Sequence, residues 1–141
     1  MPVKMTLRCG LPAYLAMSCL AVGVLALSAV AQEGHPLTGS WHGDWGTSPT
    51  QRTPVLLYMK WDSKNIVGKI NPGPKAVNLT VATLDPSKWM VHLEGDGKDA
   101  AGNPVHIVID GKLENIGSYN RTLTGTWMQG AIKGDFKVTR D

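Results

Sequence analysis

Two histidines and their neighbouring carboxylates are the side chains of this sequence best suited to hold a metal. His92 and His106 fall on consecutive segments that alternate between apolar and polar residues, and Glu94 and Asp110 share their polar face. Imidazole nitrogens and carboxylate oxygens are common zinc ligands. We expect the two histidines nearly opposite each other on the flat outer face of one hairpin, where solvated cross-strand neighbours are the more common arrangement. The sequence therefore predicts no metal site and no cofactor.

The chain carries no recognisable catalytic motif. It lacks a Gly-x-Ser-x-Gly elbow, a P-loop and a His-Glu-x-x-His helix. The loop with Asp96, Asp99 and Asn103 lacks the ligand spacing of an EF-hand. Nearly every acid falls on an outward face or in a turn, which leaves Tyr58 and Tyr119 as the only stand-ins for an interior acid or base. We expect a protein that is not an enzyme, and keep a small barrel isomerase or lyase as a third hypothesis.

Aromatic side chains supply the candidate ligand-binding residues. The alternation directs all five tryptophans and the single phenylalanine to one inward face. Such residues fill a core that has no disulfides, and they can also line a pocket for a small apolar molecule; both interpretations stay open. The set consists of Trp41, Trp45, Trp61, Trp89, Trp127 and Phe136.

The elements that position these residues are short strands. Period-two alternation recurs along about eight segments separated by turns rich in Gly, Pro, Asn and Asp, and no segment after residue 31 has sustained helical periodicity. The residues expected to face inward are Trp41, Gly43 and Trp45; Val55, Leu57, Met59 and Trp61; Ile66, Gly68 and Ile70; Val77, Leu79 and Val81; Trp89, Val91 and Leu93; Val105, Ile107 and Ile109; Leu123, Gly125 and Trp127; and Ile132, Gly134, Phe136 and Val138.

A repeated pentad favours a closed arrangement of these strands. Leu-Thr-Gly-x-Trp occurs at Leu37–Trp41 and again at Leu123–Trp127, near the two ends of the strand region. A sheet that rolls up until its ends meet brings both copies together and removes exposed edges. We predict an all-β fold, an antiparallel up-and-down barrel of about eight strands. A two-sheet sandwich permits the same alternation and is the alternative.

Residues 1–31 have the features of a signal peptide. Lys4 and Arg8 precede an apolar run, and Ala29-Val30-Ala31 supplies a cleavage site. A retained membrane anchor, or a lipid anchor at Cys19, is the less favoured alternative. We expect an exported protein, periplasmic or extracellular, with one barrel domain over 32–141 and no stable membrane insertion after cleavage.

The exported part has nearly balanced charge and no cysteine. Beyond residue 31, 12 Lys and Arg oppose 11 Asp and Glu, a net charge of +1, and the signs are interspersed. A nucleic-acid-binding surface normally carries a basic stripe, so we expect no nucleic-acid partner. Both cysteines lie within residues 1–31, so the fold depends on its core alone.

Several motifs resemble known barrel families. Gly39-Ser40-Trp41 resembles the Gly-x-Trp signature of lipocalins and the wider calycin superfamily, in which the tryptophan closes the barrel base beneath a basic side chain; Arg140 or Arg121 would be that partner. The run 37–48 also resembles the opening strand of avidin-like barrels, although Gly43 stands where that family has its ligand-binding asparagine. The run 123–140 resembles lipocalin-like domains of exported bacterial proteins of unknown function.

The function expected from these observations is binding. The favoured hypothesis is an exported, non-enzymatic, lipocalin-like barrel that binds a small hydrophobic molecule among its inward aromatic residues. The alternative is a filled barrel that acts through its outer surface as a structural or protein-interaction module, whose partner the sequence does not identify.

Overall fold

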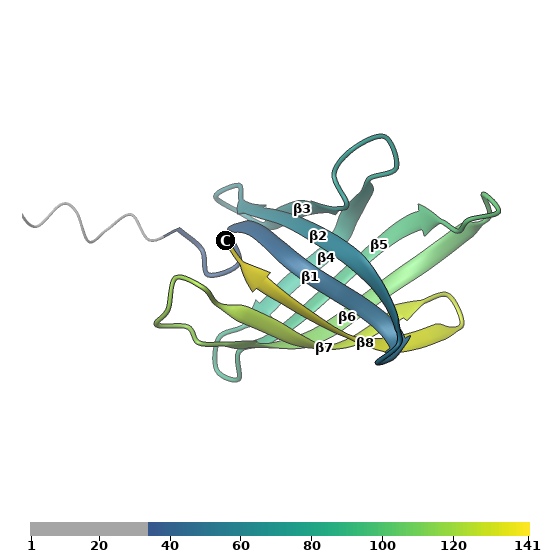
Figure 1. Ribbon diagram of the computed structural model, residues 1–141. Helices are drawn as coiled ribbons and strands as arrows, with labels where there is room; N and C mark the ends of the chain where they lie inside the picture. The colour runs from purple at the N-terminus through teal and green to yellow at the C-terminus, as the bar shows by residue number, and fades with distance from the viewer. Residues whose placement is uncertain (1–33) are drawn as a thin grey trace, which may run out of the picture. The chain divides into compact units, whose positions relative to one another are not determined.

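Eight strands form a closed antiparallel barrel within residues 34–141, the part of the chain that the computed structural model describes. Each strand pairs with its neighbours in sequence and β8 pairs back with β1, as Figure 1 shows. This confirms the predicted all-β barrel over the sandwich, whereas the predicted signal peptide lies outside the described residues. No helix in this range is long and apolar enough to cross a bilayer. The strands are β1 (Gly39–Ser48), β2 (Gln51–Trp61), β3 (Ile66–Ile70), β4 (Val77–Asp85), β5 (Met90–Lys98), β6 (Pro104–Glu114), β7 (Thr122–Gln129) and β8 (Ile132–Arg140).

The barrel closes between the two regions that carry the pentads, as the repeat predicts. The β1–β8 ladder sets Trp41 opposite Arg140 and Trp45 opposite Phe136. Trp127, from the second pentad, stacks on Trp45 with ring centroids 5.3 Å apart. Backbone pairing therefore joins β1 to β8, and Trp127 of β7 contacts aromatic rings of both strands.

The alternating apolar residues fill the interior. A strand places successive side chains on opposite faces, so one apolar residue in two points into the barrel. An eight-stranded barrel is narrow enough for its own side chains to fill it. The buried apolar residues are Leu37, Trp41, Val55, Leu57, Met59, Ile66, Ile70, Val91, Leu93, Ile107, Ile109, Leu113, Leu123, Trp127, Phe136 and Val138.

The segment before β1 closes the base of the barrel. Leu37 is fully buried, and its carbonyl accepts a 2.9 Å hydrogen bond from the indole Nε1 of Trp41. Arg121, only 7% exposed, donates hydrogen bonds to the carbonyls of Pro36 and Ile116. Arg140, one of the two basic residues expected to cover Trp41, lies instead with its guanidinium over the ring of Tyr119, 5.1 Å from the centroid.

The structure corrects three of the predicted inward positions. A β-bulge between Leu79 and Val81 adds one residue to β4, so Val81 pairs with Glu94 on the outer face. Ile132, the first residue of β8, is 54% exposed. Trp89 packs against the core, but from the turn before β5 and with a left-handed backbone (φ 55°) rather than from within a strand. Trp61 is the last residue of β2 and is 46% exposed, because the barrel wall ends where its side chain emerges.

The wall is thinnest at the junction of β3 and β4, which we call the seam. Only Lys69↔Asn78 and Ile70↔Val77 pair across the seam, whereas the β5–β6 ladder runs from Met90↔Lys112 to Lys98↔Pro104. None of the residues of β4 is fully buried. The chain therefore closes its barrel with one short, weakly paired junction.

Candidate functional site

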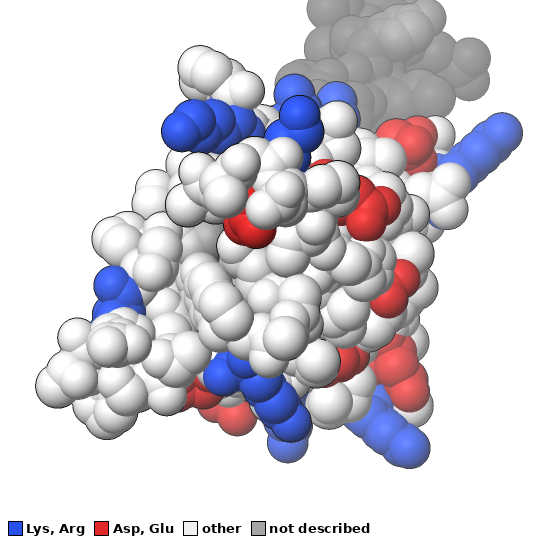
Figure 2. Space-filling view, turned by 90° about the vertical axis from the view of Figure 1, so that its right-hand side faces the viewer, with Lys and Arg blue, Asp and Glu red and all other residues white. Residues whose placement is uncertain are grey.

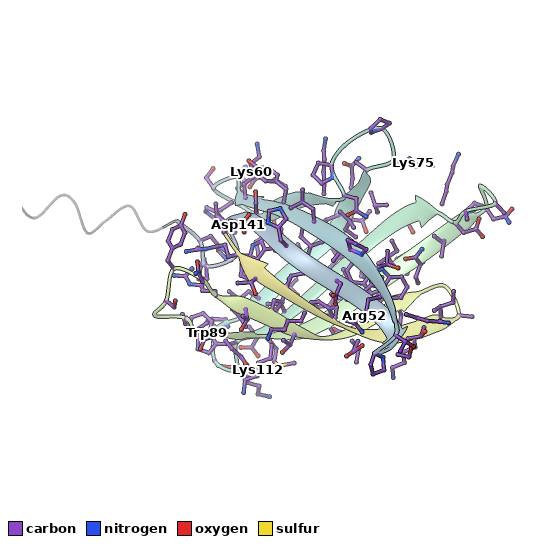
Figure 3. All side chains as sticks on the ribbon, in the orientation of Figure 1. Arg52, Lys60, Lys75, Trp89, Lys112 and Asp141 are labelled. Atoms are coloured by element: carbon purple, nitrogen blue, oxygen red, sulfur yellow. The ribbon has the colours of Figure 1, made fainter. Side chains whose placement is uncertain are left out.

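The six predicted aromatic site residues do not form one pocket. Trp41, Trp127 and Phe136 are buried, Trp45 and Trp89 are half-buried against the core, and Trp61 is exposed. Trp45, Trp127 and Phe136 make a compact cluster, with Trp127 and Phe136 edge to face at 6.0 Å. Trp41 is bound to the base by its hydrogen bond to Leu37, and Trp89 lies at that same end of the barrel (Figure 3).

Two aromatic groups carry features that the packing alone does not explain. The indole Nε1 of Trp127 is buried and has no hydrogen-bond partner among the described residues, an arrangement that is rare in protein interiors. Trp61 stacks on the imidazole of His35, with ring centroids 5.1 Å apart. Burial by this contact lowers the pKa of His35.

The two central histidines belong to a row of five titratable side chains on the outer face of β5 and β6. The histidine–carboxylate row runs Asp110, His92, Glu94, His106, Asp96. The Nδ1 atoms of His92 and His106 lie 2.6 and 2.7 Å from their aspartates, and both Nε2 atoms lie within 3.5 Å of Glu94 Oε1. The prediction that the two histidines lie opposite each other is wrong, because the register sets each opposite an aspartate and Glu94 joins them.

The carboxylates make the imidazolium forms of this row more stable. The hydrogen bond to Asp110, with a smaller contribution from Glu94, raises the pKa of His92. The hydrogen bonds to Asp96 and then Glu94 raise the pKa of His106. Among residues 34–141, no group of three or more His, Cys, Asp or Glu side chains is arranged to hold a metal ion. The row is therefore an ion-pair chain along the wall.

Several other outward charges are also paired. The guanidinium of Arg52 bridges Asp44 (2.7 Å) and Asp135 (2.5 Å) across three strands, and His42 pairs with Asp141. Asp99 accepts hydrogen bonds from the backbone N–H groups of Ala101 and Asn103. Its role in the loop is therefore structural. These contacts stabilise the hairpins and loops that carry them.

A groove on the outer face of β2 and β3 differs from these paired surfaces. It has a volume of about 630 Å³ and extends from β1 across to the first residues of β4. Its apolar lining comes from outward residues of β2 and β3, from the β3–β4 loop and from the seam. The lining residues of this outer groove are Ser40, Leu56, Tyr58, Lys60, Val67, Gly68, Lys69, Pro72, Asn78 and Leu79.

One row of the β-ladder supplies the polar groups of the groove. Ser40 pairs with Tyr58, Tyr58 with Lys69, and Lys69 with Asn78, so one side chain from each of four strands stands in a line. Their neighbours in sequence point inward, as shown by the full burial of Trp41 and Leu57 and the near-complete burial of Ile70. The sheet therefore presents a hydroxyl, a phenol, an ammonium and an amide side by side.

These four polar side chains have no partners within residues 34–141. The structure shows no hydrogen bond or ion pair for the side chains of Ser40, Tyr58, Lys69 or Asn78, and no Asp or Glu of this range lines the groove. Lys60, seen on the β2–β3 side of the barrel in Figure 3, lies near Asp62 and contributes to the lowered pKa of that carboxyl, after the backbone hydrogen bonds from Asn65 and Lys64. Both lysines of the groove therefore lack an ion pair and a hydrogen bond within residues 34–141, and Lys69 stands within the polar row.

The β3–β4 loop forms one wall of the groove and is fixed to β2. The backbone N–H of Asn71 donates to the carbonyl of Leu56 (2.7 Å), and its side-chain Oδ1 accepts from the N–H of Leu56 (3.0 Å). Asn71 has a left-handed backbone (φ 48°), which Asn tolerates better than most residues. This double hydrogen bond holds Pro72 beside the groove.

A second hollow, of about 560 Å³, lies between the β3–β4 and β5–β6 loops. It is lined by two lysines, Lys75 and Lys98, and by two aspartates, Asp96 and Asp99. Figure 2 shows the side of the molecule that lies to the right in Figure 1, with acidic and basic residues around the periphery and uncharged atoms in the middle. Mixed charge at this hollow offers no preference for either sign of ligand.

Sequence reasoning missed the outer groove although a signal was present. Tyr58 was considered only as an interior group, yet it is 44% exposed on the outer face, and Tyr119 is 72% exposed. The outward positions of β2 and β3 include Leu56 and Val67 as well as Lys60 and Lys69, so apolar side chains occur on both faces of these strands. Apolar side chains on the outward face indicate a covered or ligand-binding outer surface.

Comparison of the chain with protein-family models, with curated proteins and with solved structures found no match.

Proposed function

We propose that this protein is a non-enzymatic, exported, lipocalin-like barrel that binds a small, largely apolar molecule, and that the outer groove is where the molecule binds. The observation that carries the proposal is an apolar hollow of about 630 Å³ bordered by polar groups without partners. Small-molecule sites combine these two features, since apolar walls supply affinity and a few polar groups fix orientation.

The proposal moves the site from the interior, where the sequence analysis expected it, to the outer face. Trp41, Leu57, Leu93 and Ile109 are fully buried against one another in the core. A ligand inside would have to displace these packed side chains, and deleting one large core side chain already costs about 2–5 kcal/mol. The groove needs no such displacement.

The charge distribution supports a small-molecule ligand over a nucleic acid. Beyond residue 31 the 12 Lys and Arg are interspersed with 11 Asp and Glu, and Arg52 is paired with Asp44 and Asp135. A phosphate backbone requires several free cations in a row. Export to the periplasm or beyond remains part of the proposal and depends on the signal-like features of residues 1–31.

A protein-interaction module is the second candidate, and the seam favours it. Beyond Asn78, the edge of β4 that faces β3 has no ladder partner among the described residues, and 77–84 contains no charged residue and no proline. An unpaired edge of this kind can accept a strand from another chain. Binding of an extended peptide that protects the β4 amides, without any binding of small molecules, would select this candidate.

Binding of a neutral apolar fluorophore, N-phenyl-1-naphthylamine, tests the proposed function. We expect saturable binding that weakens about tenfold in the double variant Leu56→Ser/Val67→Ser, because these residues form the apolar lining. The matched control is Met128→Ser/Ile132→Ser, which removes two exposed apolar side chains elsewhere (40% and 54% exposed) and should leave binding unchanged. Equal losses in both variants, or no saturable binding, would contradict the proposal.

A further inference from the structure

We infer that the outer groove selects an anionic amphiphile, a free molecule with an apolar body and a carboxylate head, and that Lys69 holds the head. This inference rests on the proposed function and adds the ligand's charge to it. Its basis is the polar row of the groove, in which Lys69 stands between Tyr58 and Asn78 on adjacent strands.

Charge complementarity favours an anion. The lining contains two lysines, Lys60 and Lys69, and no carboxylate of the described residues. Most carboxylates elsewhere on the barrel are matched with a cation or with backbone N–H groups, as Asp135 is with Arg52 and Asp62 is with its turn. Neither Lys60 nor Lys69 has an ion pair or a hydrogen bond within residues 34–141, and Lys60 additionally lies near the carboxyl of Asp62.

The neighbouring groups suit a carboxylate head. A carboxylate accepts hydrogen bonds only, and the groove offers donors from three kinds of group. The phenol of Tyr58, the ammonium of Lys69 and the amide nitrogen of Asn78 come from consecutive strands at one ladder level. Charge-assisted hydrogen bonds from such a set are stronger than neutral ones.

The apolar residues flank that level and fit the body of the molecule. Leu56 and Pro72 lie on one side of the polar row and Val67 on the other, with Leu79 at the seam. The groove is concave and within the usual volume range of small-molecule sites. A membrane surface would need apolar side chains that project outward, so a free amphiphile fits better than a lipid within a bilayer.

Separate titrations with three molecules that share an eight-carbon chain test the inference on the whole protein. Octanoate, octanol and octylammonium are titrated with detection of backbone amide shifts by NMR. We expect octanoate to bind about two- to fivefold more tightly than octanol, which is the contribution of one exposed ion pair, and octylammonium to bind most weakly. Raising the ionic strength from about 0.01 M to about 0.15 M should remove part of the octanoate preference and leave octanol unaffected.

Variants identify the side chain responsible for the preference for octanoate over octanol. Lys69→Met keeps the hydrocarbon stem and removes the charge, so it should abolish the preference for octanoate while octanol binds as before. Lys112→Met, which removes an exposed lysine from β6 on another part of the wall, is the matched control and should behave as the unmodified chain does. Lys69→Arg should retain the preference.

The outcomes separate this inference from the proposed function. Equal binding of all three molecules in the groove, or loss of octanol binding in Lys69→Met, overturns the inference and leaves the proposed function standing. Absence of binding by all three, together with no binding of N-phenyl-1-naphthylamine, overturns both. Lysine-dependent association with phosphatidylglycerol vesicles without octanoate binding would assign the groove to a membrane surface and also overturn the inference.

Discussion

The β5–β6 hairpin and the β3–β4 seam are two parts of one wall with opposite properties. The β5–β6 ladder continues to Lys98↔Pro104, and its outward histidines all have carboxylate partners. The seam pairs only through Lys69↔Asn78 and Ile70↔Val77, and the side chains of Lys69 and Asn78 have no partner among the described residues. The same alternation of apolar and polar residues underlies both.

The difference shows how to distinguish a structural surface from a binding surface. Polar groups that satisfy one another stabilise the strands that carry them and have little left to offer a ligand. Polar groups that the fold leaves unsatisfied beside an apolar hollow gain most when another molecule binds. Partnering within the chain, rather than residue type, separates the histidine–carboxylate row from the outer groove.

Core packing should show the largest contrast between these two parts of the wall. Leu93→Ala on β5 removes a fully buried side chain and should lower the free energy of unfolding by about 2–5 kcal/mol. Leu79→Ala on β4 removes a half-buried one beside the seam and should cost about 1 kcal/mol. Chemical denaturation of both variants measures the difference. Equal losses would show that the seam is packed as tightly as β5.

Hydrogen exchange should reveal the same contrast in the backbone. Amides of 80–85 that face β3 have no ladder partner within the described range, so they should exchange at least about tenfold faster than amides of β6 that are bonded to β5 or β7. Exchange detected by NMR or mass spectrometry gives the comparison. Protection of these β4 amides equal to that of β6 would mean that a contact covers the edge.

The histidine–carboxylate row should give a smaller, pH-dependent effect. Because folding raises the pKa of His92 and of His106 above 6.5, their contribution to stability is complete below that value and is lost as the pH rises through the raised pKa values. Thermal unfolding should therefore show that the unmodified chain gains stability from about pH 8 to about pH 6 relative to His92→Gln/His106→Gln. The gain should be modest and salt-sensitive, because both imidazoles are substantially exposed. A difference that does not vary with pH would remove this role.

The sequence predicted the barrel because its pattern is local and repeated. Trp41, Leu57 and Leu123 all occupy the inward positions that period-two alternation assigned to them. The alternation failed where a bulge inserts one extra residue and reverses the faces, as before Val81. It also failed where a strand ends, as at Trp61. It also assigned Asp96 to a loop, although the alternation of Gly95 and Gly97 with polar neighbours continues β5 to Lys98.

The groove was harder to predict than the fold because it depends on register. Ser40, Tyr58, Lys69 and Asn78 are far apart in sequence and meet only because three ladders align them. Alternation gives the face of each residue but not its cross-strand partner. The absence of a neighbouring carboxylate is likewise a property of the assembled surface.

The most direct test of binding outside the core is to locate the octanol-binding site on the barrel from NMR shifts of backbone amides and tryptophan indoles. Binding in the groove should shift amides of 56–60, 67–69 and 78–79 and leave the indole N–H signals of Trp41 and Trp127 unchanged. Shifts concentrated at those two indole signals, with the groove amides unaffected, would place the ligand inside the barrel and contradict the account.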